Sequence, residues 1–288
     1  MTKLTTLKRV TIQGIAGCFH DAAAREYFAG EEVTTVACDT FRAMFDTLQA
    51  DHSLLGIVAI ENTIAGSLLQ NHELLRGSSM QIVGERKLHI AHVLCALPGD
   101  DFNTLTEVNS HPMALMQCEE YLLQHPQLKM VEHNDTAGAA RDIAEHRRHG
   151  HAAVCGSLAA ELYGLDILAR DIQTNKRNFT RFLILAHDEA IKSGAVARPE
   201  HIDKASIVFS LPHTQGSLSK ILTIFSFYDM NLTKIQSMPI IGREWEYRFY
   251  VDLTFDNYKR YRQSITAVRP LMGEFKILGE YAQHEFNA

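Results

Sequence analysis

The segment from Leu54 to Ile60 constrains the fold of this chain more than any other, because none of its residues carries a polar side chain. A strand that is apolar at every position is typical of a parallel sheet that is covered by helices on both faces. Parallel strands also need crossover connections, which are usually helices. The segment therefore predicts an α/β fold.

The rest of the first two thirds of the chain alternates between strand-like and helix-like patterns. Strands are predicted near 10–14, 33–37 and 54–60, with helices near 20–30, 39–48 and 67–75. After an extended stretch at 81–97 the alternation resumes up to about residue 187. We expect a domain over 8–187 with two lobes, roughly 8–90 with 168–187, and 91–167. A ligand would bind in the cleft between them.

A change in composition separates the last third of the chain. Residues 188–203 are rich in Asp, Glu, Lys, Ser, Gly and Pro and lack periodicity, which is typical of a linker. Residues 204–282 then follow the order βαββαβ. This order predicts a small ferredoxin-like domain.

Composition excludes several classes of protein. A net charge of −6 and a pI near 6.2 argue against binding to nucleic acid. No apolar run approaches the roughly 20 residues that span a bilayer, and residues 1–9 are too polar for a signal peptide. The five cysteines are widely spaced and form no C-x-x-C pair. We expect them to be reduced packing residues of a cytoplasmic protein.

Two polar clusters adjoin apolar runs at distant points of the sequence. Glu61 and Asn62 follow the apolar strand, and Thr180 and Arg181 precede the run that begins at Phe182. A carboxyl at such a position is costly to bury unpaired, and Asn62 is a natural partner. A hydroxyl can bond a leaving oxygen, and a guanidinium can bind a carboxylate. Together the clusters predict an enzyme for a small dianionic acid, although Thr180 could equally be a strand former and Arg181 a surface charge.

Two predicted helix starts admit both a structural and a functional interpretation. Ser110 before Pro112 fits ordinary capping, and Asp135 before Thr136 fits it too. The free N–H groups of a helix start can instead hold a substrate carboxylate. Gln117, about two turns into the first helix, is either an amide that faces solvent or a group that orients the substrate.

Histidine is abundant, with 15 residues, yet no set of metal ligands emerges. His89 and His92 lie on an extended segment where alternate side chains point to opposite faces. His146, His149 and His151 lie at a helix end, where cations favour the helix dipole. The chain also lacks G-x-G-x-x-G and Walker motifs. We therefore expect neither a metal nor a nucleotide cofactor.

Taken together, the motifs closely resemble those of prephenate dehydratases that carry a C-terminal ACT regulatory domain. The resemblance covers about residues 9–282 and implies a periplasmic-binding-protein-like catalytic domain followed by an ACT domain. It rests on Gly14-x-x-Gly17-x-Phe19, Ile60-Glu61-Asn62-Thr63-x-x-Gly66-Ser67, Ser110-His111-Pro112, Gln117-Cys118, Asp135-Thr136-Ala137, Asn178-x-Thr180-Arg181-Phe182, Asn231-Leu232-Thr233-Lys234-Ile235 and Trp245-Glu246-Tyr247.

The resemblance implies a reaction without a cofactor, in which prephenate loses CO2 and water to give phenylpyruvate in phenylalanine biosynthesis. Thr180 would bond the departing hydroxyl, and Glu61, with a pKa raised by burial, would supply the proton. The other implied site residues hold or orient the substrate: Asn62, Arg181, Ser110, Gln117, Thr63, Ser67, His111, Thr136 and Phe182. Arogenate dehydratase and a non-catalytic sensor of small acids are the alternatives.

The resemblance also implies regulation by phenylalanine in a homodimer or homotetramer that forms through the ACT domain. Phenylalanine would bind near Gly216, Leu218, Asn231 and Gln236. The usual Glu-Ser-Arg-Pro of the family reads Gln236-Ser237-Met238-Pro239 here, so we expect weak inhibition. The first glycine segment departs too, because Cys18 and His20 stand where Thr or Ser is common.

Overall fold

The computed structural model describes residues 7–197 and 199–284, and it has the predicted α/β character. The chain divides into two compact units, which are described separately. The first comprises the chain up to Thr47, then Gly56–Ser67 and Lys87–Phe182. The second comprises Leu48–Leu55, Leu68–Arg86 and the chain from Leu183 onward. Several strands pass from one unit into the other, so the unit boundaries are not domain boundaries in sequence.

The first unit contains the buried strand that the sequence predicts. This strand, β3 (Leu55–Asn62), lies between β1 (Leu7–Gln13) and β11 (Phe179–His187), and β2 (Glu32–Cys38) pairs with β1 in parallel. The helices α1 (Phe19–Tyr27) and α2 (Phe41–Ala50) make the crossover connections. Thr40 caps α2, because its hydroxyl accepts a hydrogen bond from the backbone N–H of Ala43 at 3.1 Å.

The same unit holds a separate five-stranded sheet with the order β10-β6-β9-β7-β8. Its strands are β6 (Val93–Ala96), β7 (Glu107–Ser110), β8 (Lys129–Glu132), β9 (His151–Cys155) and β10 (Asp166–Ala169). Its helices are α4 (Pro112–Gln117), α5 (Glu119–Leu122), α6 (Thr136–Glu145) and α7 (Ser157–Leu162). Cys118 separates α4 from α5. These elements span residues 93–169 and alternate between strands and helices.

The glycine segment after β1 serves close packing against α7. Gly17 has a φ of +86°, and a Cβ there would lie 2.9 Å from the Cα of Ala159. Only glycine tolerates both the left-handed backbone and this approach. Burial raises the pKa of the nearby Cys18 thiol to about 12, which makes it a packing residue and not a nucleophile.

His20, the second departure in this segment, belongs to the core that surrounds α1. Its ring lies against Phe182 and Phe41, with centroids 5.0 and 5.5 Å away, and its Nε2 accepts a hydrogen bond from the N–H of Ala59 at 3.3 Å. Burial lowers the pKa of His20 to about 4. The imidazole is therefore neutral at pH 7, as its role as an acceptor requires.

The helix predicted over 67–75 begins two residues later than expected. Gly66–Ser67 forms a short strand, β4, whose residues pair with Asn62 and Glu61 of β3 in antiparallel register. The helix α3 (Leu69–Gly77) follows and belongs to the second unit. The strand β4 thus takes the place of the first residue of the predicted helix.

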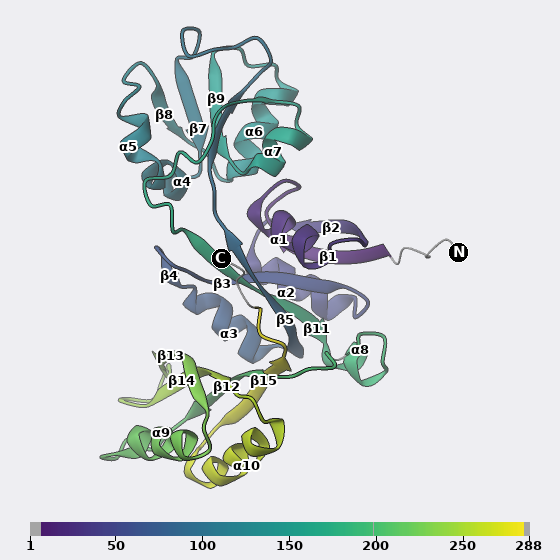
Figure 1. Ribbon diagram of the computed structural model, residues 1–288, viewed down its shortest axis with the longest axis vertical. Coiled ribbons are helices and arrows are strands. Elements are labelled where there is room, and N and C mark those ends of the chain that lie inside the picture. The colour runs from purple at the N-terminus through teal and green to yellow at the C-terminus, as the bar shows by residue number, and fades with distance from the viewer. Residues whose placement is uncertain (1–6, 198, 285–288) are drawn as a thin grey trace. The chain divides into compact units, whose positions relative to one another are not determined.

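The C-terminal part of the second unit confirms the predicted βαββαβ order. It comprises β12 (Lys204–Ser210), α9 (Ser217–Phe227), β13 (Asn231–Pro239), β14 (Tyr247–Thr254), α10 (Tyr258–Val268), a 3-10 turn (Arg269–Leu271) and β15 (Phe275–Tyr281). The antiparallel sheet has the order β13-β14-β12-β15, and both helices lie on the same side of it (Figure 1). Phe209, Phe225, Val251, Tyr261 and other buried side chains form its core.

This part contacts the preceding sequence more closely than a linker suggests. Its edge strand β15 pairs in parallel with β5 (Met80–His89) at Gly279 and Ile82. A Cβ at Gly279 would overlap the carbonyl group of Ile82, so glycine is required for this approach. The predicted linker itself contains a short helix, α8 (Asp188–Lys192).

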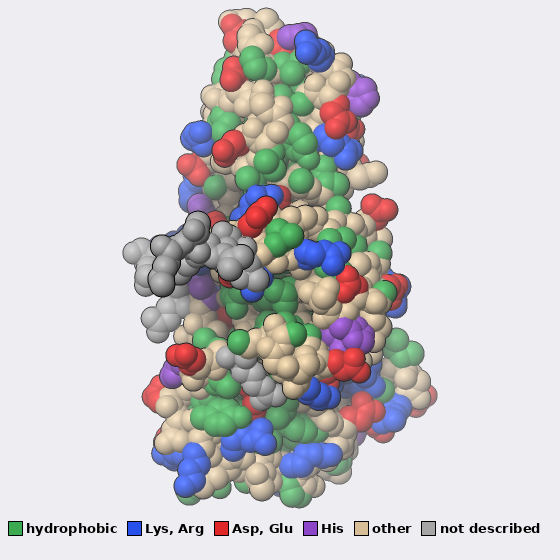
Figure 2. Space-filling view, turned by 90° about the vertical axis from the view of Figure 1, so that its right-hand side faces the viewer, with side chains coloured by type: hydrophobic (Ala, Val, Ile, Leu, Met, Phe, Trp, Pro, Cys, Tyr) green, Lys and Arg blue, Asp and Glu red, His purple; other side chains and the backbone are tan. Residues whose placement is uncertain are grey.

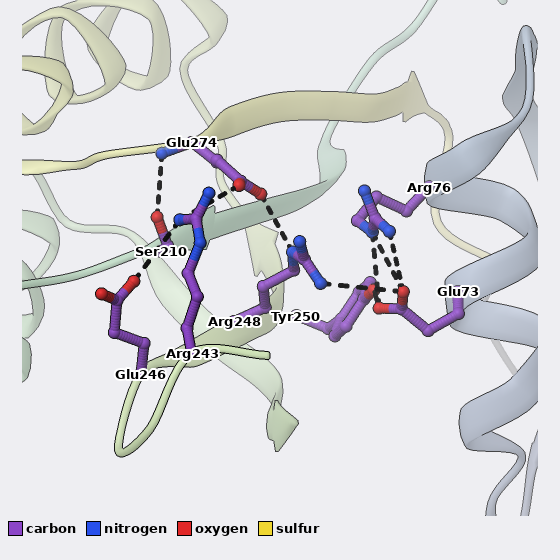
Figure 3. A network of polar contacts seen from close by, with 8 residues as sticks. All are labelled: Glu73, Arg76, Ser210, Arg243, Glu246, Arg248, Tyr250 and Glu274. Atoms are coloured by element: carbon purple, nitrogen blue, oxygen red, sulfur yellow. Dashed lines mark hydrogen bonds and ion pairs between the residues drawn. The ribbon is translucent and has the colours of Figure 1, made fainter. Parts of the chain in front are cut away.

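Polar contacts reinforce this junction. Figure 3 shows Glu73 of α3 bound to Arg76 and to the hydroxyl of Tyr250, while Arg248 contacts Glu274 at 3.0 Å. The ammonium group of Lys276 donates hydrogen bonds to the carbonyls of Arg76 and Ser78, at the end of α3. The strands β14 and β15 therefore hold the C-terminal half of α3.

A buried ion pair lies next to these contacts. The Nζ of Lys204 lies 2.9 Å from both carboxylate oxygens of Glu85, and the two side chains are 3% and 0% exposed. The backbone N–H of His284 donates a third hydrogen bond to this carboxylate. Burying two charges is tolerable only because each satisfies the other.

The surface matches the composition. On the face shown in Figure 2, basic and acidic side chains are interspersed, without a large area of one sign. Within the described ranges, no helix has both the length and the apolar character needed to cross a membrane. All five cysteines are buried and unpaired, as predicted, although the sulfurs of Cys95 and Cys155 are 3.4 Å apart.

We predict that Lys204→Met lowers the free energy of unfolding by about 3–5 kcal/mol, because it leaves the Glu85 carboxylate buried without its cation. Adding Glu85→Leu to this variant should restore much of the loss. Lys192→Met is the matched control, since Lys192 pairs with Asp188 while 71% of its side chain is exposed, and it should change stability by less than about 1 kcal/mol. Urea unfolding measures all three, and equal losses for the two lysines would contradict the prediction.

The lowered pKa of His20 predicts that stability falls as the pH drops from 6.5 towards 4, because only the unfolded chain takes up this proton in that window. We expect this group to contribute a loss on the order of 1–2 kcal/mol between pH 7 and pH 5. His20→Phe should be less stable at pH 7 but should lose less on acidification. Exposed His213→Gln should retain the slope of the natural protein, and an unchanged slope for His20→Phe would refute the assignment.

Candidate active site

The side chain of Asn62 organises the polar cluster at the end of β3. Its Oδ1 accepts hydrogen bonds from the backbone N–H groups of Ile64 at 2.9 Å and Ala65 at 2.8 Å. A backbone N–H can only donate, so the atom that faces it must be the carbonyl oxygen. These two bonds therefore determine which way the carboxamide points.

The amide nitrogen of Asn62 consequently faces β11 as a donor. Nδ2 lies 2.8 Å from Oδ1 of Asn178, 3.0 Å from Oγ1 of Thr180 and 3.2 Å from the carbonyl of Phe179. The hydroxyl oxygen of Thr180 thus accepts a hydrogen bond in this cluster. Its own hydrogen remains available for donation, which is what a group that bonds a leaving oxygen needs.

The same reasoning assigns the orientations of Asn178, Gln117 and His92. With Oδ1 of Asn178 facing Asn62, its Nδ2 donates to Oε1 of Gln117 at 2.9 Å. The Nε2 of His92 lies 3.1 Å from the same Oε1 and must also be a donor. His92, Gln117, Asn178, Asn62 and Thr180 therefore form one directional network, which we call the amide relay.

Glu61 differs from its prediction. Its Oε1 lies 3.5 Å from Nη1 of Arg181, and 35% of its side chain is exposed. Arg181 itself is 6% exposed. The carboxyl is therefore half-buried, as its place after the apolar strand predicts, but its partner is Arg181 and not Asn62. This contact with the guanidinium favours a role in holding Arg181 over the predicted role of Glu61 as the acid.

Three further candidate residues have structural contacts. Ser110 is fully buried, and its hydroxyl donates to the carbonyl of Val154 at 2.6 Å, so it does not cap α4. The exposed His111 is the cap, with Nδ1 accepting from the N–H of Met113. Phe182 is 1% exposed and packs in the core. The predicted contacts of Ser110 and Phe182 with substrate are therefore not favoured.

The hydroxyl of Thr63, the backbone of Ser67 and the helix start at Thr136 also have partners within the chain. The hydroxyl of Thr63 accepts from the N–H of Phe179 and donates to the carbonyl of Arg177. Ser67 pairs with Glu61 across the β3–β4 turn. Thr136 begins α6, where the carboxylate of Asp135 already accepts from the N–H of Gly138 at 2.7 Å. The carboxylate at this helix start is therefore the side chain of Asp135 and not a carboxylate of the substrate.

The four predicted effector residues lie in the C-terminal part of the second unit. Gly216 precedes α9 in a left-handed conformation with a φ of +78°, and Leu218 packs against the core below that helix. Asn231 is exposed and Gln236 is half-buried on β13, the edge strand of the sheet. Nδ2 of Asn231 faces Oγ1 of Thr254 at 3.4 Å, and Nε2 of Gln236 donates to the carbonyl of Ser237.

The described residues offer one group of possible metal ligands, namely His52, His187 and Glu189. The two imidazole rings are stacked, with centroids 3.5 Å apart and planes at 9°. Nitrogen lone pairs lie in the plane of each ring, so two parallel rings cannot direct them at one ion. His89 and His92 have separate partners, Lys176 and Gln117, and share no site.

Sequence reasoning missed two members of the amide relay. Asn178 opens the Asn-Phe-Thr-Arg-Phe motif but received no role, because an Asn before a strand is common in turns. His92 was considered only as a metal ligand. The available signal for both was their position at the edges of extended segments, where a polar residue that is buried needs a partner.

Comparisons with known proteins show to which family the chain is similar. The prephenate dehydratase family model matches residues 10–190. Arogenate dehydratase 5 of Arabidopsis thaliana is 36% identical over an alignment of 291 residues with gaps, and the alignment covers 95% of this chain and 67% of that protein. The chain spans about two thirds of the length of the curated relatives it matches.

Two solved structures are similar over nearly the whole chain. GqqA, described as a novel type of quorum quenching acylase, is 28% identical with a TM-score of 0.85, covering 98% of this chain and 100% of that one. The prephenate dehydratase of Arthrobacter aurescens in complex with L-Phe is 27% identical with a TM-score of 0.81, covering 95% of this chain and 89% of that one. Since the family model spans more than half of the residues, this chain belongs to the prephenate dehydratase family.

Proposed function

We propose that this protein converts prephenate to phenylpyruvate, CO2 and water in phenylalanine biosynthesis. The observation that carries the proposal is the orientation of Thr180, whose oxygen accepts from Asn62 while its hydrogen remains available. Prephenate dehydration needs such a donor, because the step that limits it expels hydroxide from the ring.

The reaction balances with one proton. The bond from the ring to its carboxylate breaks and releases CO2, and its electron pair enters the ring. The carbon–oxygen bond at the opposite ring carbon then breaks, and the leaving oxygen takes up a proton to become water. Aromatisation supplies the driving force, so no cofactor is required. A donor placed at the leaving oxygen typically contributes about 10²–10⁴-fold.

We assign Thr180 as the donor to the leaving oxygen and Asn62 as the group that orients it. A Thr hydroxyl is too weak an acid to give up its proton entirely, so the proton comes from solvent or passes through Thr180 from another group. Arg181 supplies positive charge for a substrate carboxylate, and Gln117 offers its amide hydrogens to a substrate oxygen. Glu61 holds the guanidinium of Arg181 in place.

Arogenate is the second candidate substrate, because a curated relative is named for it. Arogenate has an amino group where prephenate has the keto oxygen, and it would yield phenylalanine directly. Incubation of the protein with each substrate decides between them, with phenylpyruvate followed by its absorbance in alkali and phenylalanine by chromatography. Binding of both acids without turnover would instead favour the non-catalytic sensor.

We predict that Thr180→Val lowers kcat by at least about tenfold with little change in KM, because the lost contact forms mainly in the transition state. Thr180→Ser retains the hydroxyl and should stay within severalfold of the natural protein. Asn62→Asp keeps the acceptor for Ile64 and Ala65 but loses the donor to Thr180, so its kcat should fall as well. Full kcat in a folded Thr180→Val protein would disprove the assignment.

We further propose that residues 204–282 form an ACT-type regulatory domain that assembles a homodimer or homotetramer and binds phenylalanine. The exposed edge strand β13 supports pairing with a second copy, since unpaired strand edges are usually covered. The N-terminus of α9 at Gly216 offers free N–H groups for a carboxylate. The complex of a similar prephenate dehydratase with L-Phe supports the choice of ligand.

The neutral Gln236 predicts that phenylalanine binds and inhibits weakly, at concentrations near millimolar. Gln236→Glu should tighten binding, because it restores a charge worth on the order of 1 kcal/mol for the ammonium group of the ligand. Calorimetric titration, inhibition kinetics and light scattering test the three claims. No heat and no inhibition at millimolar phenylalanine would refute the effector, and a monomer at micromolar concentration would refute the assembly.

A further inference from the structure

We propose that His92 is a positioning residue of the active site, which acts through Gln117 and Asn178 on the carboxamide of Asn62 and the hydroxyl of Thr180. This inference rests on the proposed function, because the groups that it aligns are those assigned to the reaction. His92 reacts with nothing itself. Its role is to keep Oε1 of Gln117 oriented towards the amide group of Asn178.

The structure holds His92 firmly. The residue lies between β5 and β6 and is 2% exposed. Its backbone N–H donates to Oε1 of Gln173 at 2.9 Å, and its carbonyl accepts from the N–H of Ile172 at 3.0 Å. The ring meets Phe19 edge-on, with centroids 5.4 Å apart. The backbone and the ring are therefore both fixed.

The direction of the relay assigns the proton on this ring. Oε1 of Gln117 accepts from Asn178, so the nitrogen of His92 that faces the same oxygen carries a hydrogen. Nδ1 has no hydrogen-bond partner among the described residues. Burial lowers the pKa of His92, although the bond to Gln117 opposes this. The residue is thus a neutral imidazole with its hydrogen on Nε2.

Because His92 and Asn178 both donate to Oε1 of Gln117, the orientation of its carboxamide is defined and Nε2 points away from them. No described residue accepts a hydrogen bond from Nε2 of Gln117, and the side chain is only half-buried. Both amide hydrogens are therefore offered to a substrate oxygen. If the carboxamide turned over, its oxygen would repel that substrate oxygen, and its amide would face the donors of His92 and Asn178. His92 prevents this exchange by adding a second donor.

The test uses the full chain and first compares three variants with the natural protein. His92→Phe keeps the ring but removes the donor, and we expect kcat/KM to fall about tenfold or more. His92→Gln places an amide N–H near the original Nε2 and should recover to within about threefold. His72→Phe is the control for replacing a buried histidine, since His72 is 5% exposed, packs on Tyr250 and lies outside the relay. Thermal unfolding checks that each variant is folded.

A double-mutant cycle distinguishes positioning from general destabilisation. If His92 acts through Gln117, then adding His92→Phe to Gln117→Ala should cost little beyond Gln117→Ala alone. Additive losses, or a His92→Phe enzyme with natural kcat/KM, would overturn the proposal.

A readout without substrate separates this inference from the proposed function. Nitrogen NMR of the imidazole should show His92 neutral with its hydrogen on Nε2 at pH 7, and Gln117→Ala should reduce this preference. A hydrogen on Nδ1, or a charged ring, would refute the relay even in an active enzyme. An inactive natural protein would refute the proposed function, but the NMR measurement would still test where the hydrogen on His92 lies.

Discussion

The two backbone hydrogen bonds to Oδ1 of Asn62 are the constraint on which the candidate site depends. Amide oxygen and nitrogen are nearly the same size, so nothing but the hydrogen-bond pattern tells them apart. Here the pattern begins at backbone groups that cannot reverse. Every later orientation follows from it, through Asn178 and Gln117 to His92 in one direction and to the hydroxyl of Thr180 in the other. The tight turn between β3 and β4 thus decides which way a hydroxyl on another strand can donate.

A network of neutral groups suits a substrate that carries two carboxylates. Charges in the relay would either bind these carboxylates in unwanted places or cost desolvation energy. Carboxamides and a hydroxyl provide direction without charge, and the guanidinium of Arg181, next to Thr180, has a carboxylate partner in Glu61. Preorganised dipoles of this kind stabilise charge that develops during a reaction, because they need not reorient when it appears.

The second compact unit shows that packing groups the chain differently from its sequence pattern. The strand β5 and the helix α3 precede the C-terminal part by more than a hundred residues, yet they share its packing. Gly279 allows β15 to approach β5, the Lys204–Glu85 pair fills the buried space beside them, and Lys276 binds the end of α3.

Local patterns in the sequence determined the α/β class and the βαββαβ order, and they singled out Asn62 and Thr180 as candidates, because hydrophobic periodicity and short motifs depend on neighbours in the chain. Tertiary structure alone decided the rest. Gly66 and Ser67 form a strand and not a helix start because Glu61 and Asn62 offer pairing partners. Asn178 bonds residues 61 and 116 positions away, and His92 bonds residues 25 and 81 positions away. A hydrogen bond between distant residues leaves no trace in local spacing, so only the folded chain reveals it.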